Sequence, residues 1–125
     1  MYSVSVRRDF IARHFLIGGD WGSENEPHAH HYIMEVKIKH DQLDQHGYLL
    51  DIVDIESGID TIEDLYRDKL LNELPEFAGL NPSLEHFARI IWEKLVEIVK
   101  LPGKGILTIK LWENESCYAS YKQEY

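Results

Sequence analysis

The chain has 125 residues, of which 44% are hydrophobic and 28% charged, and its formal net charge is −9. This length suits one domain spanning residues 1–125, and the apolar fraction is enough for a core. The acidic balance argues against a nucleic-acid or anionic-membrane partner, because affinity for either rests on Lys and Arg. It leaves room for a small phosphorylated molecule held by a local cluster of cations.

The same sequence indicates where the protein works. It contains one cysteine, Cys117, so no disulfide can form within the chain. No run approaches the roughly 18 apolar residues of a membrane span. The first residues are polar and basic and lack the apolar run of a signal peptide. We therefore expect a cytoplasmic protein.

The first part of the chain alternates in the manner of strands. Residues 2–14 place apolar and polar side chains on opposite parities, which predicts a strand. Residues 18–27 (GGDWGSENEP) are rich in turn formers and predict a loop. Residues 28–39 alternate again and predict a second strand, and His46-Gly47 marks a turn.

The second part begins with helical spacing. Apolar residues recur every three or four positions over 54–66, although Gly58 weakens that helix. Asn81-Pro82 is typical of a helix start, with Asn as the cap and Pro at the first helical position. A clear amphipathic stripe follows, and Pro102-Gly103 is expected to end the helix. Residues 105–113 and 117–123 predict two final strands, with a turn near Asn114.

The order strand, strand, helix, helix, strand, strand indicates an α+β fold. We expect a four-stranded antiparallel sheet with two helices on one face. Such a sheet has two unpaired edges, so association of several copies is expected.

Seven histidines are many for this length, and three of them have a suggestive spacing. His28 and His30 are two apart on a strand, so their side chains share a face. Antiparallel pairing places His14, at the end of the first strand, beside them. Three neutral imidazoles leave one tetrahedral position open, as in a catalytic zinc site, and suit copper or nickel less selectively. The alternative is that these are ordinary strand-end histidines; His31 has the wrong parity, and His40, His46 and His86 are read as solvent or packing residues.

Several short motifs stand in order along nearly the whole chain. Residues 10–14 read F-I-A-R-H and residues 28–32 read H-A-H-H-Y. The later ones are Gly47, Asp51 and Ile52; Asp68, Leu71 and Asn72 within R-D-K-L-L-N; Asn81, Pro82, Ser83 and Glu85; and Glu113 eight residues before Tyr121. In this order they resemble the 6-pyruvoyl-tetrahydropterin synthase family and its relatives, the 6-carboxy-tetrahydropterin synthases of queuosine synthesis.

The resemblance implies a structure and a site. The fold would be the tunnelling fold, in which the sheets of several subunits close into a barrel, usually as trimers stacked into hexamers. His14, His28 and His30 would bind zinc. Glu113 would anchor a pterin ring, since an ionised carboxylate can accept two parallel N–H bonds. Taken alone, Glu113 would be read as a solvated carboxylate at a strand end.

The chain departs from the family pattern at its acid/base residues. The family commonly has a cysteine a few residues before the first histidine of its H-G-H motif, whereas this chain has Glu24, with Glu26 nearby. A branch of the family also carries glutamate there, and it cleaves the side chain of dihydroneopterin triphosphate to a folate precursor. Glutamate serves as a base if burial raises its pKa from about 4.3 towards neutrality. The usual histidine after Asp68 is replaced by Lys69, which needs a lowered pKa to act as a base but not to act as an acid or phosphate contact.

Two interpretations follow from these replacements. In the first, the protein is a zinc-dependent lyase acting on the side chain of 7,8-dihydroneopterin triphosphate or a related pterin. Zinc would then act as a Lewis acid, Glu24 as the base, and Asp68 and Lys69 would be catalytic residues beside the reacting side chain. In the second, the protein binds zinc and a pterin without turning it over. A third possibility is an interaction domain with the same barrel and no zinc.

Overall fold

The fold is organised around two long strands. A computed structural model describes residues 1–125, and in it β1 (Tyr2–His14) and β2 (His28–His40) form a full-length antiparallel ladder. The ladder runs from Tyr2 opposite His40 to His14 opposite His28. The alternation that predicted both strands decides which face of the sheet each side chain occupies.

Two shorter strands complete a single sheet. β3 (Ile106–Trp112) pairs with β2, and β4 (Tyr118–Glu124) pairs with β3, all antiparallel. The strand order is β1-β2-β3-β4, so β1 and β4 are the two edges. The predicted four-stranded antiparallel sheet is confirmed, with each of the last strands within one residue of its expected bounds.

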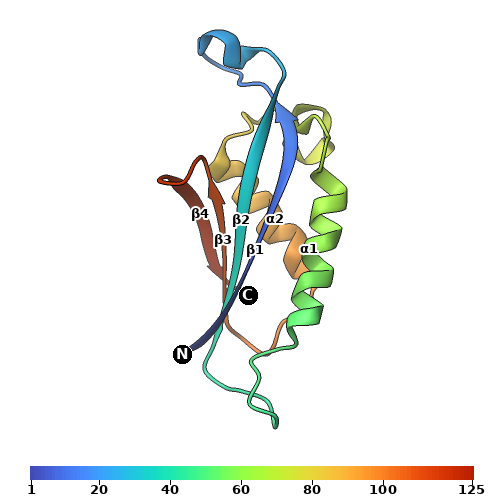
Figure 1. The fold of residues 1–125 in the computed structure, drawn as a ribbon, viewed down its shortest axis with the longest axis vertical. Helices are drawn as coiled ribbons and strands as arrows, with labels where there is room; N and C mark the ends of the chain where they lie inside the picture. Colours follow the sequence, from blue (N-terminus) through green and yellow to red (C-terminus); the bar gives the residue numbers. More distant parts are fainter.

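Two helices cover one face of this sheet (Figure 1). α1 (Ile52–Tyr66) lies beside β1, and α2 (Leu84–Ile98) packs against β3 and β4. Their apolar stripes and the inward positions of the strands form one core of 23 buried residues. The indole Nε1 of Trp92 on α2 donates to the carbonyl oxygen of Leu107 at 2.9 Å, which ties α2 to the sheet.

The start and end of α2 differ from the sequence prediction. Ser83, not Asn81, is the N-cap, and its hydroxyl accepts from the amide of His86 at 3.1 Å. The Asn81 side chain accepts instead from the amide of Ile17, 64 residues away. The helix ends at Ile98, before Pro102, because Val99 is extended with its side chain buried.

The connections bring distant parts of the chain to one end of the sheet. Short 3₁₀ segments occupy Gly22–Asn25, Leu71–Glu73 and Pro75–Phe77. After α1, the amide of Asp68 donates to the carbonyl oxygen of Ile11 at 2.7 Å. The amide of Arg13 donates to the carbonyl oxygen of Lys69 at 2.8 Å. The chain after α1 therefore runs along the end of β1 that carries His14. No helix in the structure combines the length and apolar character needed to cross a membrane.

Candidate metal centre

Three histidines from β1 and β2 gather on the helix-covered face of the sheet. His14 and His28 are direct cross-strand partners, and their Nε2 atoms lie 3.0 Å apart. His30 is two residues further along the same face, with its ring centre 5.4 Å from that of His14. The three residues singled out by spacing are thus neighbours in space. His31 points to the opposite face, where it pairs with Asp9 at 2.8 Å.

Burial keeps two of these imidazoles neutral. His14 is only 8% exposed. Burial lowers its pKa to about 4, with His28 and His30 as further causes. Burial also lowers the pKa of His30, against an opposing effect of Glu113. Near neutral pH both rings therefore carry a free lone pair, which metal binding requires.

Hydrogen bonds at Nδ1 orient two of the rings with their Nε2 atoms directed at each other. The Nδ1 of His28 lies 2.8 Å from the carbonyl oxygen of Glu26, to which it donates. The Nδ1 of His14 lies 2.8 Å from the hydroxyl oxygen of Tyr32. Burial raises the pKa of Tyr32, so this partner stays a neutral phenol. Bonds of this kind at one ring nitrogen orient metal-binding histidines and fix their tautomer.

The third ring has a nitrogen with no partner. The Nε2 of His30 is buried and makes no hydrogen bond. A buried polar atom of this kind is costly unless something satisfies it. Tetrahedral zinc at about 2.05 Å from each nitrogen would separate two ligands by about 3.3 Å, close to the His14–His28 separation. No group of three or more His, Cys, Asp and Glu side chains stands fully preassembled as a metal site. Three imidazole nitrogens are nonetheless a donor set that suits zinc chemically.

Two carboxylates lie around this histidine cluster. Glu113 immediately follows β3, and its amide donates to the carbonyl of Cys117 at 2.8 Å. Both Glu113 and Glu24 act to raise the pKa of His30, and Glu113 also contributes to the raised pKa of Tyr32. Both carboxylates are exposed, and each is near enough to His30 to act on its pKa.

The loop that carries Glu24 is fixed to the chain after His14. The carbonyl of Glu24 accepts from the amide of Leu16 at 2.9 Å. The side-chain amide of Asn25 donates to the carbonyls of Leu16 and Gly19. The side chain of Asn72 both donates to and accepts from the backbone of Phe15, each at 2.9 Å. Sequence patterns predicted no role for these asparagines; their place in a turn-rich loop and in a family motif was the only signal.

Asp68 and Lys69 are less closely assembled. Their backbones join β1 within three residues of His14, and Asp68 has a φ of 61°, which is uncommon for a residue other than glycine. Both are exposed, and neither side chain makes a hydrogen bond or ion pair in the chain. The structure therefore places them near the cluster without connecting them to it.

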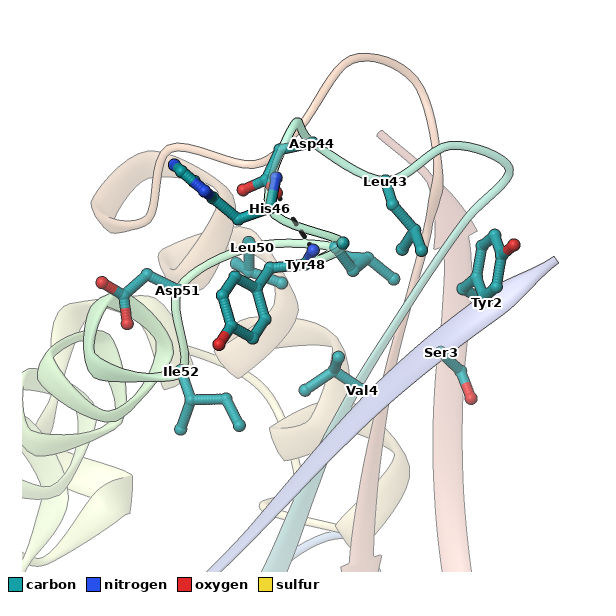
Figure 2. Close-up of a pocket in the computed structure, with 12 residues that line it drawn as sticks. Tyr2, Ser3, Val4, Leu43, Asp44, His46, Tyr48, Leu50, Asp51 and Ile52 are labelled. Atoms are coloured by element: carbon teal, nitrogen blue, oxygen red, sulfur yellow. Dashed lines mark hydrogen bonds between the residues drawn. The ribbon is translucent and has the colours of Figure 1, made fainter.

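A large cavity lies at the other end of the sheet. Its volume is about 840 Å³, and it opens between the start of β1 and the connection 43–52 that leads into α1 (Figure 2). Asp44 holds that connection in place by accepting from the amides of His46 and Tyr48. None of the three clustered histidines lines this cavity. The cavity is thus separate from the candidate metal centre.

The fold and the cluster define an α+β protein with three histidines at one end of an antiparallel sheet. The model of the 6-pyruvoyl tetrahydropterin synthase family matches residues 3–124, and the chain belongs to that family.

Individual relatives agree with this membership. The 6-pyruvoyl tetrahydrobiopterin synthase of Dictyostelium discoideum is 25% identical over 99 residues, covering 78% of this chain and 71% of that one. The Caenorhabditis elegans 6-pyruvoyl tetrahydropterin synthase structure aligns with a TM-score of 0.80 at 20% identity, covering 98% and 97%. A Plasmodium vivax 6-pyruvoyltetrahydropterin synthase aligns with a TM-score of 0.79 at 14% identity, covering 99% and 98%. That protein is described as a catalytic residue mutant in which cysteine replaces glutamate.

Proposed function

We propose that this protein is a zinc-dependent lyase that acts on the side chain of 7,8-dihydroneopterin triphosphate or a related pterin. The observation that carries the proposal is the gathering of His14, His28 and His30, with the buried Nε2 of His30 lacking any partner. Membership in the 6-pyruvoyl tetrahydropterin synthase family supports pterin side-chain chemistry. Association into a trimer or hexamer through the free edges of β1 and β4 is part of the same proposal.

The metal would be held by the Nε2 atoms of the three histidines. When bound, zinc supplies Lewis-acid polarisation of the substrate's side-chain hydroxyls, which makes an adjacent proton more acidic. Tyr32 and the carbonyl of Glu26 orient the rings of His14 and His28 through their Nδ1 atoms. The helix-covered side of the sheet shields His14 from water, which keeps its imidazole neutral and available.

Glu24 is the residue we assign as general base, with Glu26 as the alternative. Glu24 lies near enough to His30 to affect its pKa, and its backbone is fixed by the amide of Leu16. The catalytic glutamate named in the Plasmodium vivax relative supports a glutamate in this role.

The remaining residues position the substrate. Glu113 accepts hydrogen bonds from the N–H groups of the pterin ring, as its place beside His30 and Tyr32 supports. Asp68 and Lys69 complete the catalytic set beside the reacting side chain. Lys69 is exposed and would contact a phosphate of the substrate.

Matched glutamine variants test the base assignment. Glu24→Gln removes the proton acceptor without changing the size of the side chain, so turnover should fall by about 10²-fold or more while zinc stays bound. Glu26→Gln is the control and should keep turnover within a few-fold of the parent. Turnover is measured by product mass after incubation with dihydroneopterin triphosphate, and zinc by metal analysis. The reverse ranking of the two variants would assign the base to Glu26.

The second candidate is a zinc- and pterin-binding protein without catalysis. It is favoured by the state of the catalytic set, since Glu24, Asp68 and Lys69 are all exposed and share no hydrogen bond. It predicts one zinc and one pterin per site, with no product under conditions where both are bound.

A further inference from the structure

The helix-free face of the sheet carries a concentration of positive charge. Along each strand, the side chains on this face alternate with those that point into the core. Its charged residues other than His31 are Arg7, Arg13, Lys37, Lys39, Lys110 and Lys122, with Asp9, Glu35 and Glu124. This face therefore has six of the 13 Lys and Arg but three of the 22 Asp and Glu, a formal charge of +3 in a chain of −9.

The carboxylates of this face leave most of its cations uncompensated. Asp9 is engaged with His31 at 2.8 Å. Glu35 accepts from the hydroxyl of Ser5 at 2.9 Å and pairs with Lys110 at 3.7 Å. The other five cations have no carboxylate oxygen within 4.0 Å; they are Arg7, Arg13, Lys37, Lys39 and Lys122. Arg7 lies instead over the ring of Trp112.

One row across the sheet places a hydroxyl between two of these free cations. Lys37 lies opposite Thr108, and Thr108 lies opposite Lys122. Neighbouring strands are about 4.8 Å apart, so the two lysine backbones are roughly 10 Å from each other. Their side chains are long enough to converge above Thr108. Lys37 is half-buried, and Lys39 adds a third free ammonium two residues along β2.

We propose that this row, Lys37–Thr108–Lys122, binds a small phosphate-bearing anion. Ammonium groups flanking a hydroxyl supply charge and hydrogen-bond donors for phosphate oxygens. A small anion is favoured over nucleic acid because a long polyanion extends beyond the face into the field of an acidic protein. A short one feels mainly the charges within a Debye length of about 8–10 Å.

This site is separate from the candidate metal centre. The clustered histidines point to the helix-covered face, so the sheet itself lies between the two sites. The inference does not depend on the proposed lyase activity.

Inorganic tripolyphosphate is the probe for this site, and its binding to the full chain is measured by titration calorimetry at low salt. Lys37→Gln with Lys122→Gln should weaken binding about tenfold or more, because each change removes a charged hydrogen-bond donor. Lys100→Gln with Lys104→Gln is the matched control: it removes the same charge from exposed lysines in the α2–β3 connection. The control should bind within about twofold of the parent. Equal loss in both double variants would overturn the proposal, since only net charge would then matter.

Two further variants locate the anion on the sheet. His28→Ala should bind tripolyphosphate as the parent does, and loss of binding there would assign the anion to the histidine cluster instead. Thr108→Val keeps a β-branched side chain on the strand without the hydroxyl, so it should weaken binding severalfold in a folded protein. Sedimentation of the Lys37/Lys122 variant should show the parent's mass. A smaller mass would overturn the proposal by showing that the face is a contact between copies of the chain.

Discussion

The hydrogen bond between Tyr32 and His14 is the contact on which the orientation of the buried histidine depends. Tyr32→Phe removes the partner of His14 Nδ1 and leaves the packing of the ring nearly unchanged. Partners of this kind typically change metal affinity by 10- to 100-fold, so we expect zinc affinity to fall by about that factor. Competition with a chromogenic chelator measures it.

Tyr66→Phe is the matched control for that experiment. Tyr66 is also buried, and its hydroxyl donates to Glu76 at 3.0 Å, away from the histidines. Its loss should leave zinc affinity unchanged. An equal loss of zinc affinity in both variants would show that Tyr32 acts only through general packing.

The lowered pKa of His14 makes the metal-free protein sensitive to acid. In the folded state this pKa is about 4, below the ordinary value of 6.5. As pH falls below about 6.5, the imidazole of His14 binds a proton in the unfolded chain but stays neutral in the folded chain. The free energy of unfolding is therefore highest above pH 6.5 and decreases as pH falls towards 4. Between pH 7 and pH 5 the loss should be about 2 kcal/mol.

Urea unfolding of chelator-treated protein at the two pH values measures this loss. His14→Gln cannot titrate in this range, so its free energy of unfolding should change less between pH 7 and pH 5. The same change in parent and variant would place the sensitivity at another group.

At the scale of the elements, close packing against Val99 explains why α1 contains the helix-weakening residue Gly58. A Cβ at this position would meet the Cγ2 of Val99 at 2.3 Å, so the glycine allows α1 and the chain after α2 to approach closely. Ala improves helix propensity by about 1 kcal/mol, but overpacking costs about 1–3 kcal/mol. Because Val99 is itself buried and cannot easily move, we expect Gly58→Ala to be net destabilising by about 1 kcal/mol.

Thermal and urea unfolding check this prediction against a neighbouring helical position. Ser57→Ala lies on the exposed side of α1 and should be neutral or slightly stabilising. A more stable Gly58→Ala protein would mean that Val99 repacks at little cost.

The elements could be predicted from sequence wherever a local period was strong. Alternation over residues 2–14 and 28–39 was enough to find β1 and β2, because each has one buried and one solvent-facing side. The cap of α2 was predicted wrongly because Asn81 and Ser83 are both good capping residues. The choice between them depends on the amide of Ile17, which occupies Asn81 and is distant in sequence.

At the scale of the whole molecule, the candidate site was predictable in part. The histidine spacing and the antiparallel pairing were sufficient to bring His14, His28 and His30 together. The hydrogen bonds from the side chains of Asn25 and Asn72 were not predictable, because their partners are backbone atoms, which every residue has. The positive charge of the helix-free face was also hidden in a net charge of −9, since it appears only once the register is known.

The most direct test combines metal and product in one sample. The protein is loaded with zinc, given dihydroneopterin triphosphate without oxygen, and analysed for bound metal and for product masses. His28→Ala is compared with His46→Ala, which removes a histidine outside the cluster. We predict one zinc per chain and a cleaved or eliminated pterin product for the parent and His46→Ala, and neither for His28→Ala. Full zinc retention in His28→Ala, or no product from a folded, zinc-loaded parent, would contradict the proposed function.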